Sequence, residues 1–390
     1  MKFKEPQEVL LLGPGPSPVH PRVLQAMSWN TLGHLDLEFM EIMNEASDLL
    51  RYVFETENQV TFPVSATGSA GMEAALVNIL EPGDKAIVCV NGVFGARMAD
   101  VASRCGVEVI KVEADWGNPI DPDAIEKELE THSKVKMVGI VQAETSTGVL
   151  QPLEPVVELA RRYEALVVAD TVTSLGGLSV GVDITGLDVV YSGTQKCISC
   201  PPGLAPLTLN ERALSVIRAR KTKVQSWYFD LTMLTRYWGE ERFYHHTAPI
   251  NMIYALYAAL TLIKEEGLQE RFARHLLSSK ALISGLEALG LRMLISEPYR
   301  LPSLHTVMIP EGINDVDVRM RLRKNYNIEI GGGLGPFKGK LWRVGLMGHG
   351  SHRYNVERLL KALSEVLGSM GYKCSGQEAM SAVTQVYKKS

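Results

Sequence analysis

Short apolar stretches alternate with amphipathic stretches between about residues 60 and 210. The apolar stretches are rich in branched side chains and predict strands at 86–90, 108–112, 135–141, 165–169, 189–192 and 204–209. The stretches between them have a helical period and predict helices at 70–80, 96–105, 122–131, 152–163 and 211–221. Helices between uniformly apolar strands are typical of a mostly parallel sheet that is covered on both faces. The pattern therefore predicts an α/β fold.

A long helical pattern at 250–289 comes next, and it is followed by a mixture of strand-like and helical patterns. These patterns predict strands at 304–309, 328–330 and 341–346 and helices at 315–323 and 355–368. Such a mixture is typical of a smaller α+β domain, and 390 residues suffice for more than one core. We expect an N-terminal arm at 1–20, a large domain at 21–265 and a small C-terminal domain at 266–390.

Composition and charge exclude several classes of function. The chain is 46% hydrophobic and 22% charged, with a net charge of −4, which is typical of a globular protein. The slightly acidic balance without a basic stripe argues against nucleic-acid binding, and no apolar run is long enough for a membrane span. The five cysteines are odd in number and form no disulfide framework. Together with an N-terminus that lacks a signal-peptide core, they predict a cytoplasmic protein.

Cys197 and Cys200 form a C-x-x-C motif. The sequence has no second such motif and no histidine pair with ligand spacing, so we predict no metal site.

Lys196 and Asp170 each follow a predicted strand. A lysine in apolar surroundings loses its proton near neutral pH and can form a Schiff base with a carbonyl. Because ligands bind at the carboxyl ends of parallel strands, we expect both side chains in one site. Pyridoxal phosphate requires a lysine that holds its aldehyde and an aspartate that keeps its pyridine nitrogen protonated. For either residue alone, a surface lysine or a helix-capping aspartate is the alternative.

The loop around Thr67, Gly68 and Ser69 opens onto a predicted helix, where free main-chain amides and the helix dipole favour a phosphate. A plain helix cap is the alternative. Phe94 follows another strand and can stack on a flat cofactor, unless it is simply a core residue.

Thr145 and Arg343 are candidate contacts for substrate. Thr145 also follows a strand, and we expect it to bond the cofactor's phenolic oxygen or the substrate; a turn rich in Ser and Thr is the alternative. Arg343 lies inside an apolar strand and needs a partner. Its guanidinium fits a substrate carboxylate, and an internal ion pair is the alternative.

These motifs resemble the class V pyridoxal-phosphate aminotransferases, specifically the alanine–glyoxylate (serine–pyruvate) aminotransferase group. The likeness extends over nearly the whole chain, from Gly-Pro-Gly-Pro at 13–16 through 192–202 to 244–247 and 342–348. It implies fold type I, with a mostly parallel seven-stranded sheet in a large domain and a smaller α+β C-terminal domain. It also implies pyridoxal 5′-phosphate as cofactor and a homodimer with shared active sites.

The resemblance implies a role for each candidate residue. Lys196 is the Schiff-base lysine and Asp170 the pyridinium partner, and both are catalytic. Val172 packs on the ring face opposite Phe94, and the neighbouring subunit contributes Tyr244 and Thr247. Gly33 lies where the family brings N-terminal residues to the substrate, and Arg343 binds its carboxylate. The cofactor phosphate is held by Thr67, Gly68, Ser69 and Gln195.

The implied reaction is ping-pong transamination between a small amino acid, alanine or serine, and glyoxylate or another small 2-oxo acid. The sequence departs from the group at Phe94, where tryptophan is common, and at Ser69, where some members have histidine. Related alternatives are a ureidoglycine–glyoxylate or 2-aminoethylphosphonate aminotransferase. A cysteine desulfurase fits less well because Gln195, not histidine, precedes Lys196. A non-catalytic protein and a cofactor-free Schiff-base lyase are alternatives of another class.

Overall fold

The computed structural model describes residues 5–389, so residues 1–4 of the expected N-terminal arm, and Ser390, lie outside the described residues. The main sheet has seven strands in the order β2-β10-β9-β8-β5-β3-β4. β10 is antiparallel to both of its neighbours, and the other pairs are parallel. The expected mostly parallel sheet is confirmed. The bounds are β2 Val60–Val64, β3 Lys85–Val90, β4 Glu108–Glu113, β5 Val135–Val141, β8 Leu166–Asp170, β9 Val189–Tyr191 and β10 Ala205–Leu209.

Helices pack against this sheet and bury it. α3 contacts β9 and β10, α4 contacts β3 and β5, and α6 contacts β5 and β8. Strands β2, β8, β9 and β10 are buried along their whole length. The bounds are α1 Pro21–Ala26, α2 Leu37–Phe54, α3 Gly68–Ile79, α4 Val93–Arg104, α5 Pro122–Thr131, α6 Glu154–Arg162, α7 Val182–Thr185, α8 Glu211–Arg218 and α9 Leu231–Trp238.

The C-terminal part is built on a small antiparallel sheet in the order β11-β14-β13. The expected strand at 328–330 is present but does not join this sheet. It forms β12, which pairs with the N-terminal strand β1. The bounds are β1 Leu10–Leu11, β11 Leu304–Met308, β12 Ile328–Glu329, β13 Gly331–Gly332, β14 Leu341–Gly345, α12 Asp315–Tyr326, α13 Arg353–Ser369 and α14 Gly376–Lys389.

The helical region expected at 250–289 is two helices, α10 Ile250–Glu266 and α11 Leu268–Ala288. Gly267 separates them with a φ of 83°, a conformation that side-chain-bearing residues rarely adopt. The turn brings the end of α10 beside the first turns of α11. Shorter elements complete the chain: β6 Ala143–Glu144, β7 Val149–Leu150 and single 3₁₀ turns at Glu297–Tyr299, Gly335–Phe337 and Gly348–Gly350.

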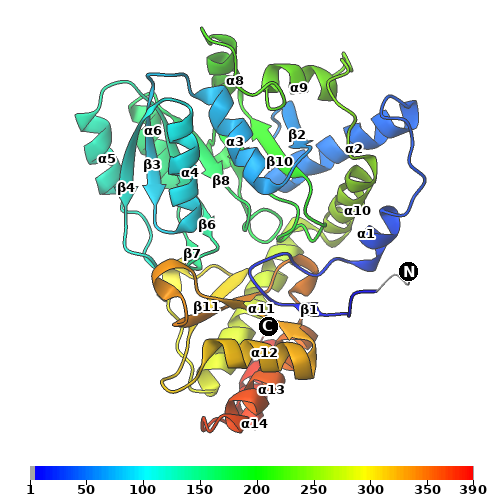
Figure 1. The fold of residues 1–390 in the computed structure, drawn as a ribbon, viewed down its shortest axis with the longest axis vertical. Coiled ribbons are helices and arrows are strands. Elements are labelled where there is room, and N and C mark those ends of the chain that lie inside the picture. Colours follow the sequence, from blue (N-terminus) through cyan, green and yellow to red (C-terminus); the bar gives the residue numbers. More distant parts are fainter. Residues whose placement is uncertain (1–4, 390) are drawn as a thin grey trace.

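Two separate clusters of apolar side chains form the larger cores. One extends from Val23 to Leu268 and surrounds the main sheet, and the other joins Leu12 to residues between Ala281 and Val383. In Figure 1 the main sheet lies above the small sheet and α12–α14, and the blue N-terminal chain runs between the two parts. The domain boundaries at 20/21 and 265/266 stay predictions. Among residues 5–389, no helix is long and apolar enough to cross a membrane.

Candidate active site

The turn after β9 buries Lys196, which is only 8% exposed. Its amine donates a hydrogen bond to the carbonyl of Pro14 in the N-terminal segment. Burial and, to a smaller extent, the positive charge of Arg343 lower the pKa of Lys196 to about 8. The side chain is therefore poised to lose its proton close to neutral pH, which a surface lysine does not do.

Asp170 is the last residue of β8 and pairs in register with Tyr191 of β9. Its carboxylate accepts hydrogen bonds from the main-chain N–H of Val172 and the hydroxyl of Tyr191, both at 2.9 Å. Burial raises the pKa of Asp170 to about 6, although these two bonds and the charge of Lys196 pull it down. Asp170 and Lys196 thus both lie at the carboxyl ends of the neighbouring strands β8 and β9. Tyr191 was not among the site residues predicted from the sequence.

Glu144 is a second buried carboxylate, and its part in the site was also missed. It accepts hydrogen bonds from the main-chain N–H groups of Phe94 at 3.1 Å and Gly95 at 3.3 Å. The hydroxyl of Ser146 donates to it at 2.6 Å. Burial raises the pKa of Glu144, although these hydrogen bonds act to lower it. Glu144 therefore caps the start of α4 and fixes the main chain that carries Phe94.

The start of α3 has the features of an anion site. Thr67 occupies the N-cap position, but its hydroxyl does not cap the helix, so no capping side chain competes with an anion for the N–H groups of Gly68 and Ser69. Gly68 packs tightly: a methyl group there would lie 3.3 Å from Gly193 and 3.4 Å from Val172. The side-chain oxygen of Gln195 is buried without a partner among the described residues. The residues predicted to hold a phosphate are thus close together.

Arg97 joins this group from α4. Its guanidinium donates to the Ser69 hydroxyl at 3.2 Å and lies 4.9 Å from the centre of the Phe94 ring. The sequence offered one signal for it, the spacing of three residues from Phe94 on a helix.

Arg343 lies in β14 and is 8% exposed. It donates to the carbonyl of Gly332 at 2.7 Å and to that of Thr145 at 3.2 Å. Among residues 5–389 it forms no ion pair, and binding of a substrate carboxylate by Arg343 stays a prediction. Burial lowers its pKa to about 10. The Thr145 hydroxyl bonds that of Thr173, so Thr145 reaches Arg343 through its main chain.

Gly33, Tyr244 and Thr247 lie elsewhere in this chain. Tyr244 is 52% exposed, and its hydroxyl is 3.3 Å from that of Thr247. The ring of His34, next to Gly33, lies 4.9 Å from the ring of Tyr244. The three residues predicted to serve from an N-terminal loop or a neighbouring subunit therefore gather on one exposed surface.

All five cysteines are free thiols, and each is buried or partly buried. Burial raises the pKa of Cys197 and of Cys200, which keeps both in the thiol form. Within residues 5–389, no three His, Cys, Asp or Glu side chains are grouped so that they could hold a metal ion.

A mostly parallel seven-stranded sheet with a buried lysine and a buried aspartate at the carboxyl ends of its strands is typical of the pyridoxal-phosphate enzymes of fold type I. Residues 9–337 match the family described as aminotransferase class-V, and the chain belongs to that family, with fold type I of the pyridoxal-phosphate enzymes. It is 41% identical over 362 residues to an alanine–glyoxylate aminotransferase of Rattus norvegicus, which covers 92% of this chain and 87% of the relative.

Two solved structures are also similar over nearly the whole chain. An alanine–glyoxylate aminotransferase from Nostoc sp. has 47% identity and a TM-score of 0.92, with 94% of this chain and 97% of that one covered. A ureidoglycine–glyoxylate aminotransferase from Bacillus subtilis has 39% identity and a TM-score of 0.97, and both chains are fully covered.

Gly15 provides a test of how Lys196 is held. Its φ is 113°, and a methyl group there would lie 2.6 Å from the Lys196 amine nitrogen. We expect Gly15→Ala to displace the amine from its buried position and to raise its pKa toward the ordinary value of about 10.4. The pH dependence of Lys196 labelling by an amine reagent, read by peptide mass, measures this. Gly339→Ala is the control, because its φ is 75° and no atom lies within 4 Å of the added methyl. Equal labelling midpoints in both variants would contradict the expectation.

Proposed function

We propose that this protein is a pyridoxal-phosphate-dependent aminotransferase that transfers the amino group of a small amino acid, alanine or serine, to glyoxylate or another small 2-oxo acid. One observation carries the proposal: the buried amine of Lys196 lies close enough to two other buried charged groups, Asp170 and Arg343, for both to shift its pKa. A buried lysine with a lowered pKa is the nucleophile that an aldehyde cofactor needs. The family supports the same conclusion.

The residues present fit pyridoxal phosphate at both ends. The N-terminus of α3 suits a phosphate, and Ser69, Arg97 and the NH2 group of Gln195 supply further donors beside it. The carboxylate of Asp170 suits a protonated pyridine nitrogen, which offsets the cost of burying the aspartate. Phe94 and Val172 offer apolar surface for a flat ring. When bound, the cofactor supplies the electron sink that stabilises a carbanion at the substrate's α-carbon.

The chain's own groups would then have separate tasks. The neutral amine of Lys196 removes and returns protons as general base and acid, for which a pKa near the working pH is favourable. Val172 and Tyr191 hold the carboxylate of Asp170 in a fixed orientation. Arg343 binds the substrate carboxylate, because its Nη2 has no hydrogen-bond partner among residues 5–389.

A second candidate donor is (S)-ureidoglycine. A (S)-ureidoglycine–glyoxylate transaminase of Bacillus subtilis is 38% identical over 398 residues, which covers 97% of this chain and 95% of the relative. The names of this relative and of the alanine–glyoxylate aminotransferases share glyoxylate. Glyoxylate is therefore better supported as the amino acceptor than any one amino acid is as the donor. A desulfurase is not supported, because it needs an accessible reactive thiol and Cys197 and Cys200 are buried.

We also propose a homodimer with shared active sites, in which Gly33, Tyr244 and Thr247 serve the partner's site. The support is the exposed surface that carries these residues and also presents large apolar side chains. Its exposed members include Leu35, Leu37, Trp227 and Phe243. Five free thiols suit a reducing compartment, and we propose the cytoplasm as the location.

The function is tested by its two half-reactions. Protein loaded with pyridoxal phosphate should form pyruvate when L-alanine is added, in an amount equal to the active sites. Glyoxylate added next should yield glycine and restore the starting spectrum. Values of kcat/KM for alanine, serine and (S)-ureidoglycine then identify the donor. Absence of any keto acid product from all three donors would refute the proposed function.

The substrate carboxylate is tested at Arg343. Loss of a hydrogen bond to a charged group costs about 1.5–3 kcal/mol, so Arg343→Gln should raise KM for alanine and glyoxylate by roughly 10- to 100-fold. Arg319→Gln is the matched control, because Arg319 is a nearby arginine that already pairs with Asp315. Unchanged KM for both substrates in Arg343→Gln would mean that Arg343 does not bind the substrate carboxylate.

A further inference from the structure

A partly buried cluster of charges lies where α10 meets α11. The carboxylate of Glu266 accepts hydrogen bonds from the guanidinium groups of Arg271 and Arg274. Arg271 is 5% exposed, and these side chains line a cavity of about 370 Å³. Burial opposes the charge on Glu266, but the bond from Arg274 and the charge of Arg271 lower its pKa to about 2. The cluster thus keeps its charges at any working pH.

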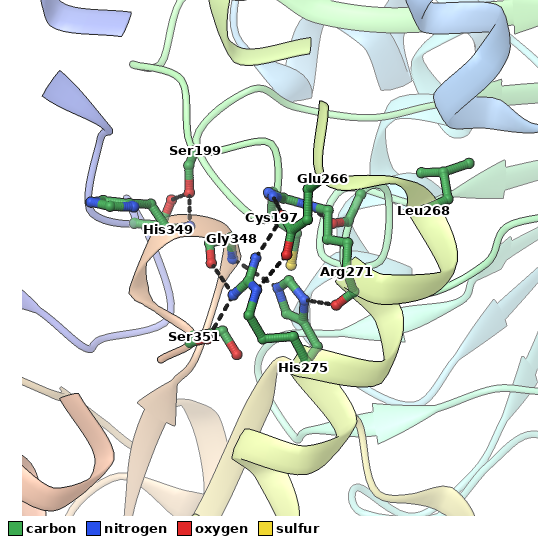
Figure 2. A network of polar contacts seen from close by, with 12 residues as sticks. Cys197, Ser199, Glu266, Leu268, Arg271, His275, Gly348, His349 and Ser351 are labelled. Atoms are coloured by element: carbon green, nitrogen blue, oxygen red, sulfur yellow. Dashed lines mark hydrogen bonds and ion pairs between the residues drawn. The ribbon is translucent and has the colours of Figure 1, made fainter. Parts of the chain in front are cut away.

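Arg271 joins the loops that follow the two central strands of the candidate site. Its Nη2 donates to the carbonyl of Cys197 at 2.6 Å, and its Nε donates to the carbonyl of Gly176 at 2.7 Å. Cys197 directly follows Lys196, and Gly176 lies six residues after Asp170. One guanidinium therefore fixes the main chain beyond both functional residues. Figure 2 shows Arg271 directed toward the turn that carries Cys197, with Glu266 beside its guanidinium.

The same turns of α11 also hold the segment that follows Arg343. Arg274 donates to the carbonyls of Gly348 at 3.0 Å and Ser351 at 2.6 Å. His275 accepts a hydrogen bond from the main-chain N–H of Gly348 at 2.9 Å, so its other nitrogen carries the proton and donates to the carbonyl of Arg271. Burial and the nearby arginines lower the pKa of His275 to about 3, which keeps this tautomer neutral. Three segments of the candidate site are thus bonded to one end of one helix (Figure 2).

We propose that Arg271 is a positioning residue for Lys196, acting through the Cys197 carbonyl and held in place by Glu266. This inference rests on the proposed function. The lysine must release its covalent partner, move a proton and return, so its main chain has to stay fixed while its side chain moves. A displacement of about 1 Å in such a group can cost a factor of about 100 in rate.

The proposed role of Arg271 depends on the forked shape of its guanidinium, which carries several hydrogen-bond donors in one plane. Arg271 points three nitrogens at three oxygens, those of Gly176, Cys197 and Glu266. A lysine at this position keeps the charge that faces Glu266 but presents a single ammonium, which cannot reach all three. Arg271→Lys therefore keeps the positive charge of the cluster but removes the arrangement of hydrogen bonds that the guanidinium makes.

The test compares Arg271→Lys with wild type and with Arg22→Lys. Arg22 forms an exposed bidentate pair with Glu265 beside the same cavity, so Arg22→Lys is a matched control. Hydrogen exchange is read at the amides of Ser199 and Cys200, which bond to the carbonyls of Lys196 and Thr194. We expect exchange there to quicken at least about tenfold in Arg271→Lys alone, while β5 and β8 keep wild-type exchange. In the loaded enzyme, kcat should fall roughly 10- to 100-fold with KM nearly unchanged.

The outcomes separate the two proposals. Unchanged exchange at these amides, or unchanged kcat despite faster exchange, overturns the positioning role. A wild type that forms no keto acid refutes the proposed function instead, while the exchange result still reports on the turn. If Arg271→Lys does not fold, Glu266→Gln replaces it, because it keeps the shape of the side chain but removes the negative charge that holds Arg271. It should then give the same changes to a smaller extent, and wild-type exchange and kcat in Glu266→Gln overturn the inference.

Discussion

Burial of the Lys196 amine is the constraint on which the site depends. A charged amine removed from water is costly, and here that cost appears as a pKa lowered to about 8. The N-terminal segment maintains the burial from nearly two hundred residues away. Pro14 accepts a bond from the amine, and Ser17 bonds the carbonyls of Gln195 and Lys196. Leu12 of the same segment belongs to the C-terminal core, so the site is closed only when both parts of the chain are folded.

Much of the fold could be predicted because the buried strands are continuous apolar runs. β2 was missed; Pro63 interrupts its apolar run, and β2 is an edge strand, although β10 beside it tolerates Pro206 between two neighbours. The pattern at 250–289 gave no sign of a break, since one glycine in a helical period is tolerated, and Gly267 nevertheless ends a helix. The pairing of β12 with β1 joins residues more than 300 positions apart, which periodicity cannot reveal.

The candidate site was predictable to the extent that it depends on strand ends. Asp170 and Lys196 could be placed together because parallel strands deliver their ends to one edge. The supporting contacts could not be predicted. The Tyr191 hydroxyl reaches Asp170 only because β8 and β9 are neighbours in this register. Glu144 and Arg271 act on main-chain groups about 50 and 74 residues away, and such bonds leave no local pattern in a sequence.

If the site works as proposed, this buried amine, and no other in the chain, bonds the cofactor. This expectation is tested most directly by borohydride reduction of protein loaded with pyridoxal phosphate, followed by digestion and peptide mass measurement. We expect a single adduct with the mass of reduced pyridoxal phosphate on the peptide that contains Lys196. An adduct on another lysine, or an unmodified Lys196 peptide in protein that carries the bound cofactor, would contradict it.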